Sequence, residues 1–148
     1  MALREAIRAL LVAGVPSIGV NWLEPFAANA DTPKPFGILR VGEAEAGDAW
    51  GGPTVPLTAS PYVAPDSFVA LDDLVVQTVA ALDHVTVDVD GTPYLLTHEV
   101  AAGQDFYDED WRAYTRAVRA RAFALGWQTG TTYAPDPVAA LRAWTDIQ

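Results

Sequence analysis

The sequence predicts an α/β (α+β) protein: a mixed, mainly antiparallel sheet flanked by an N-terminal helix, a middle helix and a short C-terminal helix. Two stretches carry apolar residues at helical spacing, near the N-terminus and in the middle of the chain. Between and after them lie short runs with strand-type alternation, one of them around an Asp-Gly turn pair. The length of 148 residues fits a single domain, residues 1–148, with one core.

The N-terminal helix is predicted from apolar residues that recur every three or four positions. These are Leu3, Ile7, Leu10 and Leu11. Gly14 and Pro16 end the pattern, so we expect a helix of about three turns. Residues 18–23 and 36–41 are short β-type runs, and we expect two strands joined by a proline-containing loop.

Residues 42–65 are rich in glycine and proline, a composition that argues against regular structure beyond a brief strand at residues 55–57. Long loops in compact domains are usually functional or mobile. We therefore expect residues 42–65 to be mobile in the free chain, with Trp50 and Tyr62 contacting a neighbouring copy of the chain or another partner protein. A solvated loop whose tryptophan folds back onto the body is an equal alternative.

The middle helix is predicted over residues 68–82, with Asp66 or Ser67 as its N-cap. Asp72 and Asp73 fall in its first turns, where the helix dipole favours negative charge. Residues 85–100 then alternate around Asp90-Gly91, which is typical of a β-hairpin.

The last third of the chain is acidic and aromatic over residues 104–111 and rich in arginine over residues 112–125. Residues 112–125 fit both an alternating strand and a helix, because alanine favours the helix, and the sequence does not decide between them. Asp136 and Pro137 form an N-cap and N1 pair that predicts the short C-terminal helix.

The charge distribution predicts a surface for self-association. The net charge is −10, and only nine lysines and arginines are present, which argues against a general duplex-DNA binder. Four arginines nevertheless gather in one decapeptide, directly after a run of acids, so we expect a partner surface of opposite sign, which another copy of the chain would supply. The expected subunit interface comprises Arg112, Arg116, Arg119, Arg121, Asp105, Asp108, Glu109 and Asp110.

Neither cysteine chemistry nor a membrane anchor is predicted. The chain has no cysteine, which excludes disulfides, thiolate nucleophiles and cysteine-ligated metals. No apolar run approaches the roughly 18 residues that a membrane-spanning helix needs, so we expect no membrane partner. The charged start, with Arg4 and Arg8 at helical spacing, predicts a mature cytosolic N-terminus.

The sequence offers little for catalysis. His84 and His98 are too far apart to form a local ligand pair. Asp88 and Asp90 resemble the centre of a calcium loop, but Thr86 and Thr97 stand where acids are needed. Walker A, G-x-S-x-G and G-x-G-x-x-G motifs are absent from the sequence. We expect a non-enzymatic protein without cofactor or metal. The alternative is a small acidic, cation-dependent binding domain or enzyme centred on the acids of residues 105–110.

Two segments carry a family resemblance: LREAIRALLVAGVPSI at residues 3–18 and FYDEDWRAYTRAVRARAF at residues 106–123. With the order of elements, they resemble the tail terminator (tail completion) proteins of long-tailed phages and gene transfer agents. The Gly/Pro-rich loop and the C-terminal helix from Asp136 depart from that pattern.

The resemblance implies a structural virion protein, assembled in the host cytoplasm, that forms a six-membered ring at the head-proximal end of the tail. Such a ring would end tail-tube growth and help join tail to head. Its partners would be itself, the tail tube protein and a head–tail connector protein, and DNA would pass through without specific binding. A head-side connector or another minor virion protein is the alternative in the same class.

Overall fold

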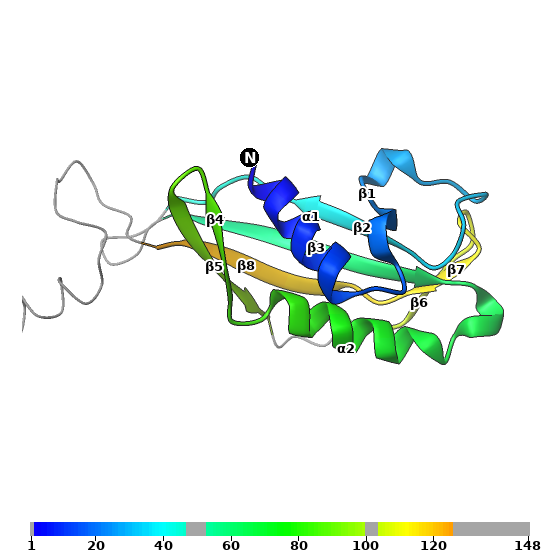
Figure 1. Ribbon diagram of the computed structural model, residues 1–148. Coiled ribbons are helices and arrows are strands. Elements are labelled where there is room, and N and C mark those ends of the chain that lie inside the picture. The colour runs from blue at the N-terminus through cyan, green and yellow to red at the C-terminus, as the bar shows by residue number, and fades with distance from the viewer. Residues whose placement is uncertain (1, 47–52, 100–103, 126–148) are drawn as a thin grey trace, which may run out of the picture.

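A computed structural model describes residues 2–46, 53–99 and 104–125 of the chain. These residues form two α-helices against one curled sheet of eight strands (Figure 1). The elements are α1 (Leu3–Gly14), β1 (Trp22–Leu23), β2 (Phe36–Val41), β3 (Thr54–Val63), α2 (Ala70–Leu82), β4 (Val85–Val89), β5 (Thr92–His98), β6 (Phe106–Asp108), β7 (Ala113–Thr115) and β8 (Val118–Ala124).

The sheet order is β1-β2-β3-β8-β5-β4, and β7 pairs with both β3 and β6. Every pairing is antiparallel except that of β1 with β2, which is parallel. The predicted class, α+β with a mixed and mainly antiparallel sheet, is confirmed. The predicted C-terminal helix from Asp136 lies outside the described residues.

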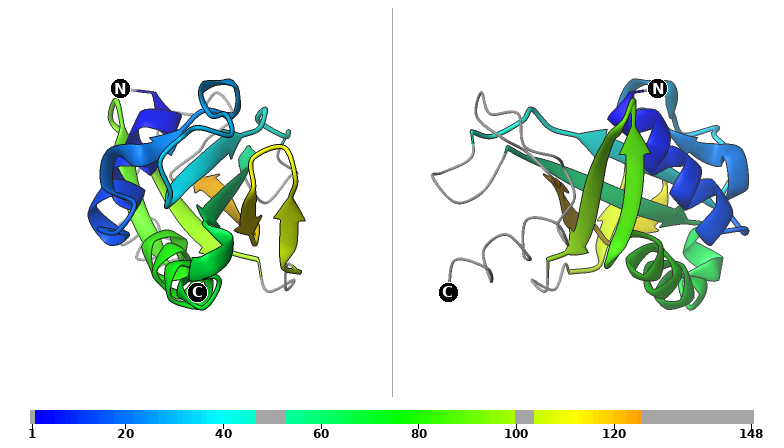
Figure 2. Two further views of the ribbon diagram at one scale, coloured as in Figure 1. Left: turned by 90° about the vertical axis from the view of Figure 1, so that its right-hand side faces the viewer. Right: turned by 60° about the vertical axis from the view of Figure 1, so that its left-hand side comes forward.

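Both helices pack on the same face of the sheet, as Figure 2 shows. The main core lies between them and the sheet, and α1 contributes Ile7 and Leu11 to it while α2 contributes Leu71 and Leu82. Burial of these apolar stripes is the chief stabilising term for both helices. The opposite face of the sheet, which we call the outer face, is therefore left for other contacts.

Strand β3 occupies ten residues of the predicted loop at residues 42–65, and the loop prediction is wrong over this part. Ten residues, Thr54–Val63, form a central strand between β2 and β8. Val55, Leu57 and Ala59 alternate toward the main core, and burial of this stripe outweighs the low strand propensity of proline. Residues 47–52 of the predicted loop lie outside the described residues.

The two prolines of β3 fit because each lies where the hydrogen-bond ladder is interrupted. The Pro56 carbonyl accepts the N–H of Gly42 (2.8 Å). The backbone nitrogen of Pro56, which has no hydrogen to donate, therefore also faces the β2 side, just beyond Val41, the last residue of β2. Pro61 has the opposite parity and faces the gap between β7 and β8. Proline therefore costs this central strand little pairing.

The predicted N-cap of the middle helix is also corrected. Pro65–Ser67 form a short 3₁₀ turn, and α2 begins at Ala70 without a side-chain cap. Ser67 is used within the turn, where its N–H donates to the carbonyl of Ala64 (2.9 Å) and its hydroxyl lies 3.4 Å from the Asp66 carboxylate. The helix itself is present.

The strand predicted at residues 18–23 is reduced to β1, because Gly19–Asn21 form a 3₁₀ helix. Strand pairing settles two further predictions. β4 and β5 form the predicted hairpin, with Asp90 and Gly91 at φ of 51° and 88°, and the Gly91 N–H donates to the Asp88 carboxylate (2.9 Å). Residues 113–115 and 118–124 are strands β7 and β8, which resolves the choice left open for residues 112–125. Arg112 lies in the turn before β7, with a φ of 50°.

Candidate functional site

An aromatic cluster covers one part of the outer face. Phe36 of β2 stacks on Tyr62 of β3, with ring centroids 4.9 Å apart, and Trp111 from the β6–β7 turn packs on both rings at 5.8 and 4.9 Å. Tyr62 is only 6% exposed. Burial raises the pKa of its hydroxyl, and the nearby charge of Asp108 raises it further.

The position of Tyr62 corrects the prediction that it contacts a neighbour from a mobile loop. It belongs to β3 and faces Phe36 and Trp111 of its own chain. The other residue of that prediction, Trp50, lies outside the described residues.

The remaining part of the outer face carries arginines in register across neighbouring strands. Arg119 of β8 pairs with Thr58 of β3, which pairs with Arg40 of β2. In the adjacent rows Arg121 lies beside Pro56 and Phe123 beside Thr54. Val118, Ala120 and Ala122 of β8 are buried on the helix side, so the residues that alternate with them point outward. We call the set Arg40, Arg119, Arg121 and Phe123 the arginine face.

Within the arginine face, the three cations differ in their partners. The guanidinium of Arg121 donates to Glu99 (2.8 Å) and to Glu45 (3.0 Å), and these two carboxylates, Glu45 foremost, raise the pKa of Arg121. Arg40 lies near the hydroxyl of Tyr62. Among the residues that the structure describes, Arg119 is exposed and forms no ion pair.

Arg116 is used inside the chain. Its guanidinium donates to Asp105 (2.6 Å) and to Asp72 of α2 (2.8 Å), and these carboxylates, Asp105 foremost, raise the pKa of Arg116. The ion pairs join the segment before β6 to α2. Arg116 and Asp105 were expected at a subunit interface, but their charges are already paired within one chain.

The β6–β7 turn presents the acids. The Asp108 carboxylate accepts the N–H of Trp111 (3.0 Å), which fixes the turn beneath the packed indole. Glu109 and Asp110 are exposed and form no ion pair with the described residues. We call Asp108, Glu109 and Asp110 the acidic turn.

Beside the acidic turn, strand β6 carries an aromatic surface. Phe106 is 61% exposed. Tyr107 contacts Tyr114 of β7, and Tyr114 in turn contacts Phe68 before α2, with ring centroids 4.9 and 4.8 Å apart. The hairpin therefore combines an acidic tip with apolar flanks.

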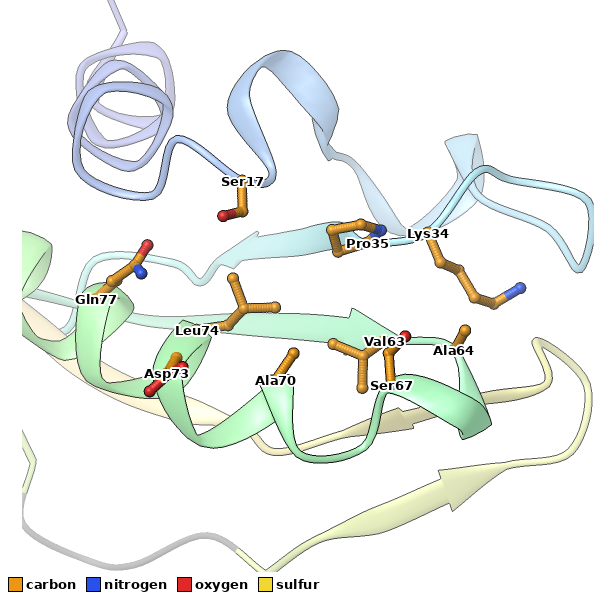
Figure 3. Close-up of a pocket in the computed structure, with 10 residues that line it drawn as sticks. All are labelled: Ser17, Lys34, Pro35, Val63, Ala64, Ser67, Ala70, Asp73, Leu74 and Gln77. Atoms are coloured by element: carbon orange, nitrogen blue, oxygen red, sulfur yellow. The ribbon is translucent and has the colours of Figure 1, made fainter.

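A pocket of about 250 Å³ lies on the helix side of the sheet, between α2 and the chain before β2 (Figure 3). Val63 and Leu74 line it, with Lys34 and Ser17 at its polar margin. The side-chain oxygen of Gln77 is buried there without a hydrogen-bond partner. None of the site residues predicted from the sequence lies in it.

The described residues do not assemble a metal centre: no group of three or more histidine, aspartate or glutamate side chains lies close enough together. His84 contacts Asp83 (3.0 Å), and the Asp83 carboxylate also accepts the backbone N–H of His98 (3.0 Å). The N–H of His98, followed by the His84 side chain, lowers the pKa of Asp83. The histidines thus surround a structural carboxylate at the start of the β4–β5 hairpin.

The structure adds residues to the site that the sequence analysis missed. Arg40, Glu45 and Glu99 join the predicted arginines through strand pairing and ion pairs. Arg40 could have been found from the sequence, because alternation along residues 36–41 places it on the same face of the strand as Phe36. The contacts of Glu45 and Glu99 depend on tertiary pairing, for which the sequence holds no local signal.

Comparison of the chain with protein-family models, with curated proteins and with solved structures finds no match. Within the described residues, no helix is long and apolar enough to cross a membrane. The functional argument therefore depends on the residues and their arrangement.

Proposed function

We propose that this chain is the subunit of a ring at the head-proximal end of a phage-type tail, where it ends tail-tube growth and helps join tail to head. The observation that carries the proposal concerns residues 106–123, the segment of strongest resemblance to tail terminators. This one segment contains the acidic turn and most of the arginine face. Both surfaces carry charges without a partner of opposite sign among the described residues of the chain.

Ring assembly accounts for two opposite surfaces on one small protein. A head-to-tail cyclic contact joins two different patches, so each subunit must present both. Charge complementarity gives such a contact its specificity and register. The resemblance sets the expected number of subunits at about six.

The partners of the ring follow from its proposed place in the particle. One rim would contact the tail tube protein and the other a head–tail connector protein. DNA would pass through the ring without specific binding, because a chain with a net charge of −10 has little capacity to neutralise phosphates.

The acidic, cation-dependent alternative receives no support from the described residues. Asp105 is held by Arg116, and Asp108 accepts the N–H of Trp111. A hard cation needs several oxygen ligands that converge, and these two carboxylates are occupied elsewhere. The head-side connector differs from our proposal only in the particle component to which the ring is attached.

Fractionation of assembly intermediates tests the proposal and separates it from the head-side alternative. Head-free tails and tail-free heads are purified from cells that produce the particles, and the chain is quantified in each by mass spectrometry. We expect about six copies per head-free tail and none on tail-free heads. Enrichment on tail-free heads would favour the connector, and absence from both fractions would refute a virion role.

A further inference from the structure

We propose that the acidic turn of one subunit docks on the arginine face of the next subunit around the ring, with Arg119 as the central cation. This contact rests on the proposed function, and it specifies which surfaces meet. It uses Glu109 and Asp110 on one side and Arg119, flanked by Arg40 and Phe123, on the other.

The arginine face has the character of a docking surface. Arg119 is exposed on a sheet whose neighbouring guanidinium, that of Arg121, is held in place by two carboxylates. Phe123, which is 37% exposed, lies on the same face of β8. Arginine and aromatic residues are enriched in the energetically dominant parts of protein interfaces. A cation that has no acidic partner among the described residues, beside an exposed aromatic ring, thus fits an acidic and partly apolar partner.

The acidic turn supplies that chemistry in a preorganised form. Its backbone is fixed by the bond from Trp111 to Asp108 and by the packing of Trp111 on Tyr62. The backbone that carries the exposed carboxylates of Glu109 and Asp110 therefore loses little conformational freedom on docking. At the end of β6 away from the turn, the 61% exposed ring of Phe106 adds apolar area on the same hairpin.

Arg119 lies away from the acidic turn along the sheet, although Arg40 and Asp108 both lie near the hydroxyl of Tyr62. Arg119 pairs with Thr58 of β3, whereas the acidic turn precedes Ala113, beyond the pairing of Tyr114 with Val63. The stretch of β3 from Thr58 to Val63 spans roughly 17 Å at about 3.4 Å per residue. In Figure 1 the β6–β7 hairpin lies at one end of the sheet, and β8, which carries Arg119 near its start, runs from there toward the other end. Two different patches displaced in this way suit a head-to-tail contact, which gives a ring when the rotation between subunits closes.

Charge reversal tests the contact in the purified full-length protein. Oligomer mass is measured by sedimentation over a range of concentrations for Arg119→Glu, for Asp110→Arg and for the variant that carries both changes. Each single reversal should raise the dissociation constant at least about tenfold, because it places like charges together. The combined variant should regain most of the lost affinity. Lys34→Glu, the same change in charge beside α2, is the matched control and should leave the oligomer intact.

Cysteine cross-linking gives a second measurement that does not depend on affinity. The chain has no cysteine, so the variant with both Arg119→Cys and Asp110→Cys carries only the two introduced thiols. Mild oxidation should produce a ladder of covalent multimers, whereas each single variant should stop at dimers. The ladder should disappear when the variant with both cysteines is diluted far below the concentrations at which it associates.

Three outcomes would overturn the proposed contact: a wild-type chain that stays monomeric at millimolar concentration, a folded Arg119→Glu variant with unchanged oligomer mass, or oxidation that yields no ladder. Loss of assembly in both single variants without recovery in the combined one would show that the two surfaces do not contact each other. The arginine face would then have a different partner, and the acidic turn would be rejected as its docking partner. None of these results bears on the fractionation of tails and heads, so this contact and the proposed function can fail separately.

Discussion

Replacing Arg116 by glutamine removes a guanidinium that bridges Asp105 and Asp72 and leaves most of the aliphatic stem in place. The Arg116 side chain is 25% exposed, and those of Asp105 and Asp72 are 36% and 73% exposed. At such exposure each ion pair contributes about 0.2–1 kcal/mol, so Arg116→Gln should lower the free energy of unfolding by roughly 1 kcal/mol. For a chain of this size the thermal midpoint should fall by about 4 °C.

Urea unfolding followed by tryptophan fluorescence, at low salt and at about 1 M salt, measures this loss. Arg119→Gln is the matched control, because Arg119 is exposed and has no acidic partner among the described residues. That variant should change stability by less than about 0.5 kcal/mol. High salt should reduce the difference in free energy of unfolding between the two variants, because it screens the ion pairs of Arg116. Equal stability of the two variants at low salt would refute the intramolecular role of Arg116.

Three further predictions concern single residues. Gly37→Ala should lower the free energy of unfolding by about 1–3 kcal/mol, because a Cβ there would overlap the buried ring of Trp22; an unchanged thermal midpoint would contradict this packing. Burial raises the pKa of Tyr62 above 10.0, so its stabilising contribution is complete below about pH 10 and is lost as pH rises through the folded-state pKa. Tyr62→Phe should weaken the loss of stability at alkaline pH. Phenolate absorbance at about pH 10 should fall by one tyrosine in the unfolded variant and stay unchanged in the folded variant. The pKa of Asp83 is lowered from 3.8 by the N–H of His98, so its contribution is present above that pH and is lost as pH falls through the lower folded-state pKa. The free energy of unfolding of the Asp83→Asn variant should therefore depend less on pH below about 4 than that of the wild type. Acid-unfolding curves that run parallel for the two proteins would count against this prediction.

Local patterns were sufficient for α1, α2 and the β4–β5 hairpin. The hairpin depends on Asp90 and Gly91, which adopt the positive φ angles that its turn needs. The helices follow from apolar stripes that reach the core as expected. These features are determined within a few residues, so one sequence is enough to predict them.

Strand β3 could not be predicted, because its prolines are tolerated for tertiary reasons. Pro56 and Pro61 lie opposite interruptions in neighbouring strands, and those interruptions do not appear in the local sequence. The same limit applies to residues 112–125, where alanine favours a helix and only pairing with β3 and β5 selects the strand.

The candidate site was predicted by residue type but not by partner. The sequence indicated opposite charges in residues 105–121, and the structure separates them into paired and unpaired groups. Arg116 and Arg121 are held by carboxylates from distant parts of the chain, whereas Arg119 is not held by any among the described residues. This division follows from ion pairs that span the sheet and α2, since Arg119 and Arg121 lie on the same face of β8.

The length of tails assembled without this chain tests the proposed function most directly. Particles are produced from cells in which its gene is deleted, and tail lengths are measured by electron microscopy, with the gene restored in trans as the control. A ring that ends tube growth predicts tubes of broadly distributed and excessive length that are not joined to heads, with normal tails regained on complementation. Tails of uniform, normal length attached to filled heads in the deletion would contradict it.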